Sequence, residues 1–431
     1  MRITGESIIP AEKRRGSTPL PFRFSKIGRR LVLKHLKKLR YGRLELKEPT
    51  GSFTFGQEQQ TLDFPVKAAI CVHDPIFYGK VLFGGSLGAA EAYMDGNWTS
   101  DSLTDVIRIL VRNESVLAEM EKGWAGLFAP LQRFRHWLRM NTQRGSRSNI
   151  SAHYDLGNDF YTLFLDETLT YSCGYFETPK RSLKEASEAK YDRICRKLRL
   201  SPEDQVLEIG TGWGGFALHA AGRYGCRVTT TTISEEQYHL ARKRIQEAGL
   251  SERVRVIRSD YRDLTGVYDK LVSIEMIEAV GHHFYDGFFR VCSERIREEG
   301  MMALQAIILR DDRYQGQLKS PDFIKRYIFP GSCIPSIAAI CNAVARSTDL
   351  RLHHLEDITS HYPRTLRAWR ERFFKNIDRV RAMGYSERFI RMWEYYLCYC
   401  EGSFLERYIG DVQMIFTKPF CRPDVGSVSG Q

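Results

Sequence analysis

The sequence predicts an α/β protein in which a parallel sheet forms the larger part and a smaller α+β domain precedes it. After Asn149, apolar strand candidates alternate with amphipathic helical stretches, which is the pattern of a parallel α/β sheet. The first of these strands runs directly into a glycine-rich turn. At 431 residues, the chain is long enough for two domains with separate hydrophobic cores.

Composition narrows the class of protein further. The content of 43% hydrophobic and 27% charged residues is ordinary for a soluble globular protein. The sequence has no apolar run of about 18 residues, so we expect no membrane-spanning helix. It also lacks the apolar segment of a secretory signal at its start. The ten cysteines form no C-x-x-C pair. We therefore expect no metal site, and we expect reduced thiols in a cytoplasmic protein.

Residues 1–50 form a basic segment that we expect to be partly flexible, and they carry much of the net charge of +12. Between Arg29 and Arg40, three apolar residues recur at helical spacing, namely Val32, Leu36 and Leu39. A basic amphipathic helix of this kind suits an anionic membrane surface. The alternative is that its apolar face packs on its own domain. Because no aromatic residues lie between its charges, we expect no nucleic-acid partner.

Residues 51–143 are assigned to an N-terminal domain associated with lipid or membrane, and residues 144–148 to a linker. We predict a strand at Val66–Val72 and a helix at Ser102–Leu117 that opens with a Ser/Asp cap. The stretch Gly84–Gly88 lacks the Gly-Lys-Ser/Thr ending of a phosphate loop. Packing at the start of a helix is therefore its expected role.

Residues 149–431 are assigned to the larger domain. The predicted strands are Gln205–Ile209, Arg227–Thr232, Arg253–Arg258, Lys270–Ile274 and Met301–Ile308. The predicted helices are Glu185–Leu198, Glu235–Ala248 and one that begins near Phe216.

The turn after the first strand has the spacing E-x-G-x-G-x-G, formed by Glu208, Gly210, Gly212 and Gly214. Glycines let the backbone approach a ligand where a Cβ atom would collide. A dinucleotide site would have G-x-G-x-x-G, with the pyrophosphate at the helix N-terminus. This spacing favours S-adenosylmethionine (SAM), because the acid is placed to accept hydrogen bonds from a cationic amine. Taken alone, the turn is equally compatible with a structural loop.

Several further stretches resemble the cyclopropane fatty acid synthases, a family related to the mycolic acid cyclopropane synthases. These stretches are Val72–Trp98, Asn149–Tyr161, Tyr171–Phe176, Thr232–Gln237, Asp260–Leu264, Ala279–Gly281, Lys325–Gly331 and Tyr385–Phe389. The resemblance covers most of the chain from Gly51 onward. It implies a Rossmann-like SAM-methyltransferase sheet.

The resemblance also implies the reaction. The family transfers a methyl group from SAM to the cis double bond of an unsaturated phospholipid acyl chain, and loss of a proton from the resulting carbocation closes a cyclopropane ring. We therefore expect a cytoplasmic enzyme on the inner face of the membrane, acting as a homodimer as the family often does. The same carbocation could instead end as a methyl-branched or methylene fatty acid. A methyltransferase for a small molecule or nucleic acid, and a lipid-binding module without catalysis, are two further possibilities.

By the same resemblance, a set of residues contacts SAM. Thr232 and Gln237 are placed for the ribose, and Asp260 and Tyr261 for adenine. Tyr261 has the alternative role of a core aromatic. The remaining expected contacts are Tyr171, Ser172, Glu208, Gly210, Gly212 and Trp213.

The expected catalytic pocket departs from the family pattern. Cys173, Glu278 and Tyr362 align with residues that, with a histidine and a backbone amide, hold a bicarbonate ion acting as base. Here Gln305 occupies the histidine position, and the amide would be that of Ile307. Glu275 stands where many relatives have glycine. Our hypothesis is that the Glu275 carboxylate replaces bicarbonate, with Gln305 as its hydrogen-bond partner. The alternative is a polar turn without this function.

Three further candidates carry less weight. Cys400 aligns with a cysteine once regarded as the nucleophile, but methyl transfer from a sulfonium to an alkene requires no covalent enzyme intermediate, so we interpret it as a structural thiol. The pair His282-His283 is interpreted as a loop, because no third ligand has suitable spacing. His153 is a candidate for ordering a lid over SAM.

Overall fold

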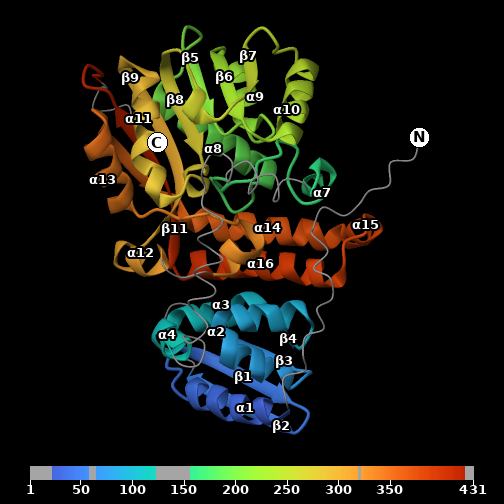
Figure 1. Cartoon of the computed structure of the whole chain (residues 1–431). Helices are drawn as coiled ribbons and strands as arrows, with labels where there is room; N and C mark the ends of the chain where they lie inside the picture. The colour runs from blue at the N-terminus through green and yellow to red at the C-terminus, as the bar shows by residue number, and fades with distance from the viewer. Residues whose placement is uncertain (1–21, 58–64, 123–155, 319–321, 423–431) are drawn as a thin grey trace. The chain divides into compact units, whose positions relative to one another are not determined.

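The computed structural model describes residues 22–57, 65–122, 156–318 and 322–422, which divide into two compact units (Figure 1). The first unit contains residues 22–57, 65–122, 322–328 and 377–406 of the described chain, and the second contains 156–318, 329–376 and 407–422. The predicted linker at 144–148 and His153 lie outside the described residues.

The first unit has a four-stranded sheet with helices, in agreement with the predicted α+β domain. The sheet order is β2-β1-β3-β4. β1 pairs antiparallel with β2 and parallel with β3, and β3 pairs antiparallel with β4. The strands are β1 (Gly42–Glu48), β2 (Gly51–Gln57), β3 (Lys67–Val72) and β4 (Trp98–Ser100). The helices are α1 (Phe22–Leu36), α2 (Ile76–Met94), α3 (Leu103–Arg112), α4 (Glu114–Lys122), α15 (Ile377–Ala382) and α16 (Glu387–Leu405), with a π-helical turn at Ile324–Ile328.

The predicted basic helix corresponds to α1, and its apolar face is used for packing within the unit. Val32, Leu36 and Leu39 are all buried, and α1 packs against α2. Lys34 and Lys37, in contrast, are exposed. The buried leucines therefore match the second of the two interpretations of this face, and the exposed lysines leave a basic surface.

Two predictions for this unit need correction. The helix predicted at Ser102–Leu117 is divided into α3 and α4 at Asn113, because the Asn113 side chain accepts hydrogen bonds from the backbone amides of Arg40 and Tyr41. The stretch Gly84–Gly88 lies inside α2 and not at its start. Gly85 has φ 58° and ψ −136°, a conformation that kinks the helix and that only glycine adopts readily.

The second unit contains a seven-stranded sheet of order β10-β11-β9-β8-β5-β6-β7. The strands are β5 (Gln205–Ile209), β6 (Arg227–Thr232), β7 (Val254–Arg258), β8 (Tyr268–Ile274), β9 (Ile296–Leu309), β10 (Arg351–Asp357) and β11 (Ile409–Thr417). The five predicted strands are confirmed as β5 to β9, and they pair in parallel. β10 and β11 were not predicted, and they add an antiparallel edge next to β9.

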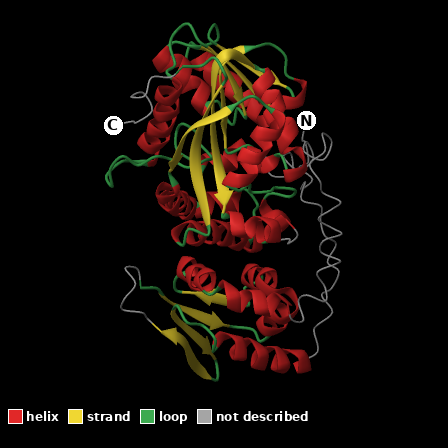
Figure 2. Cartoon of the chain, turned by 90° about the vertical axis from the view of Figure 1, so that its left-hand side faces the viewer, coloured by secondary structure: helices red, strands yellow, loops and turns green. Residues whose placement is uncertain are grey.

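Helices cover both faces of this sheet, as Figure 2 shows. Ile194 of α8 and Phe216 of α9 pack on one face, and Phe288 of α11 and Ile340 of α13 pack on the other. The helices of this unit are α7 (Asn158–Thr162), α8 (Leu183–Leu198), α9 (Gly215–Tyr224), α10 (Glu235–Glu247), α11 (Tyr285–Glu294), α12 (Asp311–Leu318), α13 (Ile337–Ser347) and α14 (Tyr362–Lys375). Burial on both faces explains why the parallel strands are apolar runs without alternation. Within the described ranges, every helix is too short or too polar to cross a membrane.

The carboxyl ends of the parallel strands form one edge of the sheet, where ligands bind in open α/β folds. Gly210 follows β5, and Thr232 ends β6. Glu275 follows β8 directly. Three of the predicted site residues therefore lie at this edge.

Candidate active site

The glycine turn between β5 and α9 leaves its backbone open to a ligand. Gly210, Gly212 and Gly214 have φ values of 103°, 51° and 85°, in the region that favours glycine. A Cβ atom on Gly212 would have no described atom within 4 Å. The amides of Gly210 and Thr211 both donate to the carbonyl of Thr231, which ties the turn to β6. The turn thus borders empty space at the ligand-binding edge of the sheet.

Glu208 provides a buried acceptor just before this turn. It is 2% exposed, and its Oε2 atom accepts no hydrogen bond from the described residues. Burial raises the pKa of this carboxyl to about 8. A buried carboxyl oxygen without a hydrogen-bond donor is stabilised by a cationic ligand group, so Oε2 of Glu208 fits the amine of SAM.

The other expected cofactor residues are held mostly by one another. Thr232 Oγ1 donates to Gln237 Oε1 at 2.8 Å. Trp213 Nε1 donates to Asn158 Oδ1 at 2.6 Å. Asn158, which was not predicted, therefore positions the indole of the glycine turn.

Asp260 and Tyr261 follow β7, as predicted, but their side chains already have partners. The Asp260 carboxylate accepts from Arg262 Nε at 2.8 Å and from its Nη2 at 2.9 Å. The Tyr261 ring packs edge-on against Phe288, with centroids 5.4 Å apart. Tyr261 is therefore a core aromatic on one side, which was the alternative interpretation of this residue.

Tyr171 belongs to a cluster of aromatic rings. Its centroid lies 5.2 Å from that of Trp369, 5.4 Å from Tyr161 and 6.4 Å from Phe329. The next residue, Ser172, accepts a hydrogen bond from Lys190 Nζ at 2.6 Å.

Glu275 is the centre of a hydrogen-bonded cluster that contains the predicted catalytic residues. Its Oε1 atom accepts from the amide of Cys173 at 2.8 Å and from Gln305 Nε2 at 2.7 Å. Its Oε2 atom accepts from the Tyr362 hydroxyl at 2.5 Å. Glu275 has φ 48°, which is uncommon for a residue other than glycine. The backbone is thus held in a costly conformation that points this side chain at its three donors.

Glu278 lies one short turn further on, in the 3₁₀ segment Ile277–Ala279. Its Oε1 atom accepts from the amide of Ile307 at 2.6 Å. Its Oε2 atom is buried and accepts no hydrogen bond from the described chain. Burial, followed by the charge of Glu275, raises the pKa of Glu278 to about 8. The amide that the family resemblance assigned to bicarbonate therefore serves Glu278 here.

Asp411 and Lys190 complete the cluster and were not predicted. Asp411 is fully buried on β11, and its Oδ2 atom accepts from Gln305 Nε2 at 3.1 Å. Burial and then the charges of Glu275 and Glu278 raise the pKa of Asp411 well above its usual range. Lys190 is fully buried on α8, and burial lowers its pKa, although the surrounding acids act in the opposite direction.

Both missed residues leave a signal in the sequence. Asp411 is a single acid within the apolar strand Ile409–Thr417. Lys190 occupies the same helical face as the buried residues Ala186 and Ile194. A charge at a core position is costly unless it is paired, so such positions are candidates for function.

The two cysteine candidates differ in location. Cys173 is fully buried, its backbone amide contacts Glu275, and its thiol donates to the carbonyl of Gly174 at 3.3 Å. Burial raises the pKa of this thiol well above its usual value, so it is a neutral group. Cys400 lies on α16 in the first unit, and burial raises its pKa as well.

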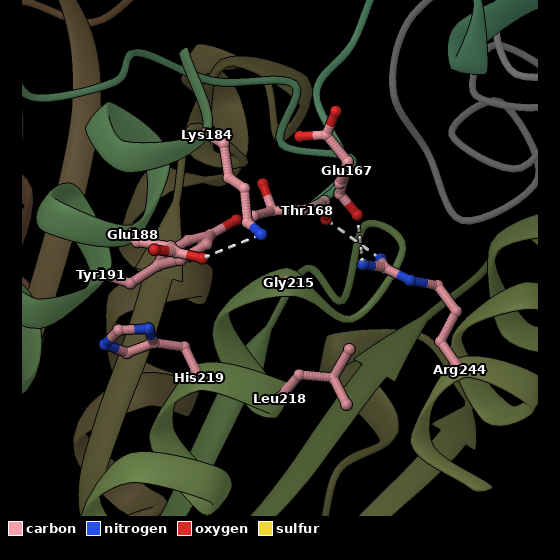
Figure 3. A pocket seen from close by; sticks show the side chains of 9 residues that line it. All are labelled: Glu167, Thr168, Lys184, Glu188, Tyr191, Gly215, Leu218, His219 and Arg244. Carbon is pink, nitrogen blue, oxygen red and sulfur yellow. Dashed lines mark hydrogen bonds and ion pairs between the residues drawn. The ribbon is translucent and has the colours of Figure 1, made fainter. Parts of the chain in front are cut away.

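A surface pocket also lies near the glycine turn, on the side of α8 and α9 (Figure 3). Arg244 projects into it and donates to the carbonyls of Glu167, Thr168 and Trp213. Lys184 and Glu188 form an ion pair on its other side. The hydrogen bond from Arg244 to the Trp213 carbonyl braces the glycine turn. The lining residues do not include any member of the Glu275 cluster.

Comparison with known proteins adds independent evidence. The family model described as mycolic acid cyclopropane synthetase matches residues 141–414. The chain is 39% identical over 332 residues to tuberculostearic acid methyltransferase UfaA1 of Mycobacterium tuberculosis, which covers 75% of this chain and 77% of that protein. It is 37% identical over 353 residues to cyclopropane-fatty-acyl-phospholipid synthase of Escherichia coli, which covers 81% of this chain and 88% of that protein.

Solved structures agree with this similarity. The cyclopropane synthase MmaA2 of Mycobacterium tuberculosis matches with a TM-score of 0.59 and 30% identity, over 63% of this chain and 98% of that chain. The mycolic acid cyclopropane synthase CmaA1, solved with SAH (S-adenosylhomocysteine) and CTAB, matches with a TM-score of 0.58 and 30% identity over 63% of this chain.

Proposed function

Since the chain belongs to the mycolic acid cyclopropane synthetase family and is a SAM-dependent methyltransferase, we propose that it cyclopropanates unsaturated phospholipid acyl chains. The observation that carries this proposal is the position of Glu275. Three donors hold its carboxylate. The neighbouring residue Met276 lies against the glycine turn, because a Cβ atom on Gly210 would be 3.3 Å from the Met276 side chain. A fixed carboxylate thus adjoins the site proposed for SAM.

The chemistry requires such a group. When bound, SAM supplies an electrophilic methyl group, and the alkene π electrons form the new C–C bond as the S–C bond breaks. The acyl chain is left with a carbocation. A base then removes a proton from the added methyl group, and the electrons of that C–H bond close the third side of the ring. The base must lie within hydrogen-bond reach of this proton.

Glu275 is our proposed base. Its two oxygens accept from Cys173 N, Tyr362 and Gln305. By the family resemblance, these three residues occupy positions that hold bicarbonate in most members. A side-chain carboxylate in that place leaves bicarbonate without its donors. Burial raises the pKa of all three acids, Glu275, Glu278 and Asp411. Glu275 is the one whose carboxylate accepts the most hydrogen bonds, from Cys173 N, Gln305 and Tyr362, and these bonds favour its ionised form.

The carbocation also needs stabilisation in a site that excludes water. The Trp369 ring packs against both Tyr171 and Tyr362. The Tyr362 and Trp369 centroids are 6.3 Å apart, and their planes are nearly perpendicular at 86°. Aromatic faces attract a cation through their quadrupole. We infer that these rings form a wall of the acyl-chain site.

We further propose that the enzyme works at an anionic membrane surface. The net charge of +12 and the exposed lysines of the first unit support this proposal. A cytoplasmic location on the inner face of the membrane, and a homodimer, remain expectations from the family resemblance.

The direct test is a product analysis. The purified full chain is incubated with SAM and vesicles of a defined monounsaturated phospholipid, and the product acyl chain is identified by mass spectrometry and NMR. The expected product has one added methylene and the proton signals of a cyclopropane ring. A methyl-branched or methylene-bearing chain would refute the ring-closing step, and unchanged lipid would refute the proposed substrate.

A further inference from the structure

A row of polar side chains crosses the sheet of the second unit and ends at Glu275. Glu356 of β10 is the register partner of Gln413 of β11, and Gln413 is the register partner of Gln305 of β9. Gln305 in turn pairs with Ile274, the residue before Glu275. Cross-strand partners project from the same face of a sheet. This face is the one that carries α8, since Lys197 of that helix contacts Gln413.

Each link of the row is a hydrogen bond. Lys197 Nζ donates to Gln413 Oε1 at 2.7 Å, and Gln413 Nε2 donates to Gln305 Oε1 at 3.1 Å. Gln305 Nε2 then donates to Glu275 Oε1 at 2.7 Å and to Asp411 Oδ2 at 3.1 Å. Gln305 and Gln413 are each 1% exposed, so water does not compete for these bonds.

The direction of the two amides matters for the base. The oxygen and nitrogen ends of a glutamine amide have nearly the same shape. If the amides of Gln305 and Gln413 both turned over, the bond between them would survive in reverse. Gln305 would then present an oxygen to the carboxylate of Glu275, which would lose a donor and face a repulsive dipole.

Lys197 removes this ambiguity at the far end of the row. A lysine ammonium has three donors and no acceptor, so Gln413 must turn its oxygen toward Lys197. The lysine is 4% exposed and is paired with Glu356, which is also paired with Arg193. Burial lowers the pKa of Lys197, and the hydrogen bond and charge of Glu356 counteract this effect. The ammonium is therefore fixed in place by an acid.

We propose that Lys197, acting through Gln413, is a positioning residue for the base: it sets the direction of both amides so that Gln305 donates to Glu275. This proposal rests on the proposed function of Glu275 as the base. Lys197 touches no reacting atom, and its effect on the reaction passes through two side chains.

The proposal is distinguished from a merely structural role by the pH dependence of turnover. The titratable groups that face Glu275 are Glu278 after β8, Asp411 on β11, Lys190 on α8, Cys173 on the segment before α8, and Tyr362 on α14. None of these is altered when Lys197 is replaced. Loss of the Gln305 donor makes the ionised form of Glu275 less favourable, so the acidic limb of the pH–kcat profile moves to higher pH.

The first experiment compares Lys197→Met with a matched control in the full chain. Lys418→Met removes another largely buried lysine, whose Nζ donates to Asp349 at 2.7 Å and which does not contact the row. We expect Lys197→Met to lower kcat about tenfold and shift the acidic limb upward, with SAM affinity unchanged. In Lys197→Arg, the acidic limb of the pH–kcat profile should lie at the same pH as in the wild type. Lys418→Met should lose thermal stability alone.

The second experiment uses Gln413→Glu, which strengthens the pairing with Lys197 but offers no donor to Gln305. Gln305 should then turn its amide nitrogen toward position 413 and its oxygen toward Glu275. We expect kcat to fall at least as far as in Lys197→Met, while thermal stability is retained. Full activity in this variant, or an unshifted acidic limb in Lys197→Met, would overturn the proposal.

Glu275→Gln in the same assay separates this proposal from the one it rests on. If Glu275→Gln is inactive and Lys197→Met behaves like Lys418→Met, the base assignment stands and the positioning role is wrong. If Glu275→Gln retains full turnover, both proposals are overturned. We expect Glu275→Gln to be inactive, and Lys197→Met to have a lower kcat and an acidic limb at higher pH.

Discussion

Glu278 is a half-buried acid whose protonation links the active site to the stability of the fold. Its pKa is about 8 in the folded chain, against an ordinary value of 4.5. Between these two values the folded state holds a proton that the unfolded chain has lost. Stability therefore falls as pH rises through this window. Glu208 contributes with the same sign, because burial also raises its pKa to about 8.

For Glu278→Gln, we expect the unfolding free energy of the SAM-free protein to depend less on pH. At about 1.4 kcal/mol per pKa unit, the difference in this dependence between about pH 5 and about pH 8 is at most about 4 kcal/mol. Denaturant unfolding of both proteins at the two pH values measures it. If the unfolding free energy of Glu278→Gln fell between the two pH values by as much as that of the wild type, Glu278 would already be ionised in the folded state.

Among single residues, the sequence predicted those members of the catalytic pocket that lie in stretches resembling the family. Cys173, Glu275, Glu278, Gln305 and Tyr362 were all predicted for one pocket, and the structure brings them together. The additional partners Asp411 and Gln413 were missed for a physical reason. They lie on an antiparallel strand whose pairing with β9 depends on contacts distant along the chain, which local patterns do not contain.

Among the elements, the glycine turn gives the sharpest prediction. Gly212→Val would place a β-branched residue at φ 51° and put its methyl groups into the space beside the turn. Gly249→Val is a matched control, since Gly249 has φ 68° and an added Cβ atom there would likewise meet nothing within 4 Å. Both variants should lose about 1–2 kcal/mol of stability through backbone strain.

Only Gly212→Val should also lose SAM binding. Thermal unfolding with and without SAM measures this difference, because a ligand that binds the folded state raises the melting temperature. We expect SAM to stabilise the wild type and Gly249→Val, and to leave Gly212→Val unchanged. Equal stabilisation of all three would place the cofactor elsewhere.

Helices and strands were predicted accurately where the local sequence pattern determines them, and missed where contacts with distant residues do. β5 and β6 were predicted to the residue, because each is an apolar or β-branched run that ends at a glycine or serine turn. The division of the helix at Asn113 was missed, because its cause is a hydrogen bond to residues 40 and 41. The antiparallel strand β10 is mostly exposed or half-buried, so it lacks the apolar pattern that reveals a strand.

On the scale of the whole molecule, the first unit is built from distant parts of the chain. α16 comes from the C-terminal region but packs on α3, where Thr104 donates to Glu401 and Arg108 and Arg112 both donate to Glu406. Gly402 allows close contact, because a Cβ atom there would lie 2.9 Å from the Ile107 side chain. The predicted domains were consecutive in the chain, so the prediction did not place the C-terminal helix α16 in the first unit.

We therefore expect Gly402→Ala to destabilise the first unit selectively, by about 1–3 kcal/mol through overpacking. The matched control is Gly287→Ala, a helical glycine of α11 whose added Cβ would meet nothing within 4 Å. Hydrogen exchange followed by mass spectrometry should show faster exchange in α3 and α16 for Gly402→Ala alone. Equal protection of these helices in both variants would contradict the close packing.

The central claim is that this enzyme carries its own base in Glu275 and does not need bicarbonate. The measurement that tests it most directly is turnover of the wild-type chain in bicarbonate-depleted buffer, with and without bicarbonate added back, beside Glu275→Gln. We predict that wild-type turnover is the same in both buffers. Glu275→Gln should lose about 10²- to 10⁴-fold, the usual contribution of a general base, and added bicarbonate should not restore it. A wild-type rate that collapses without bicarbonate and returns on its addition would contradict the account.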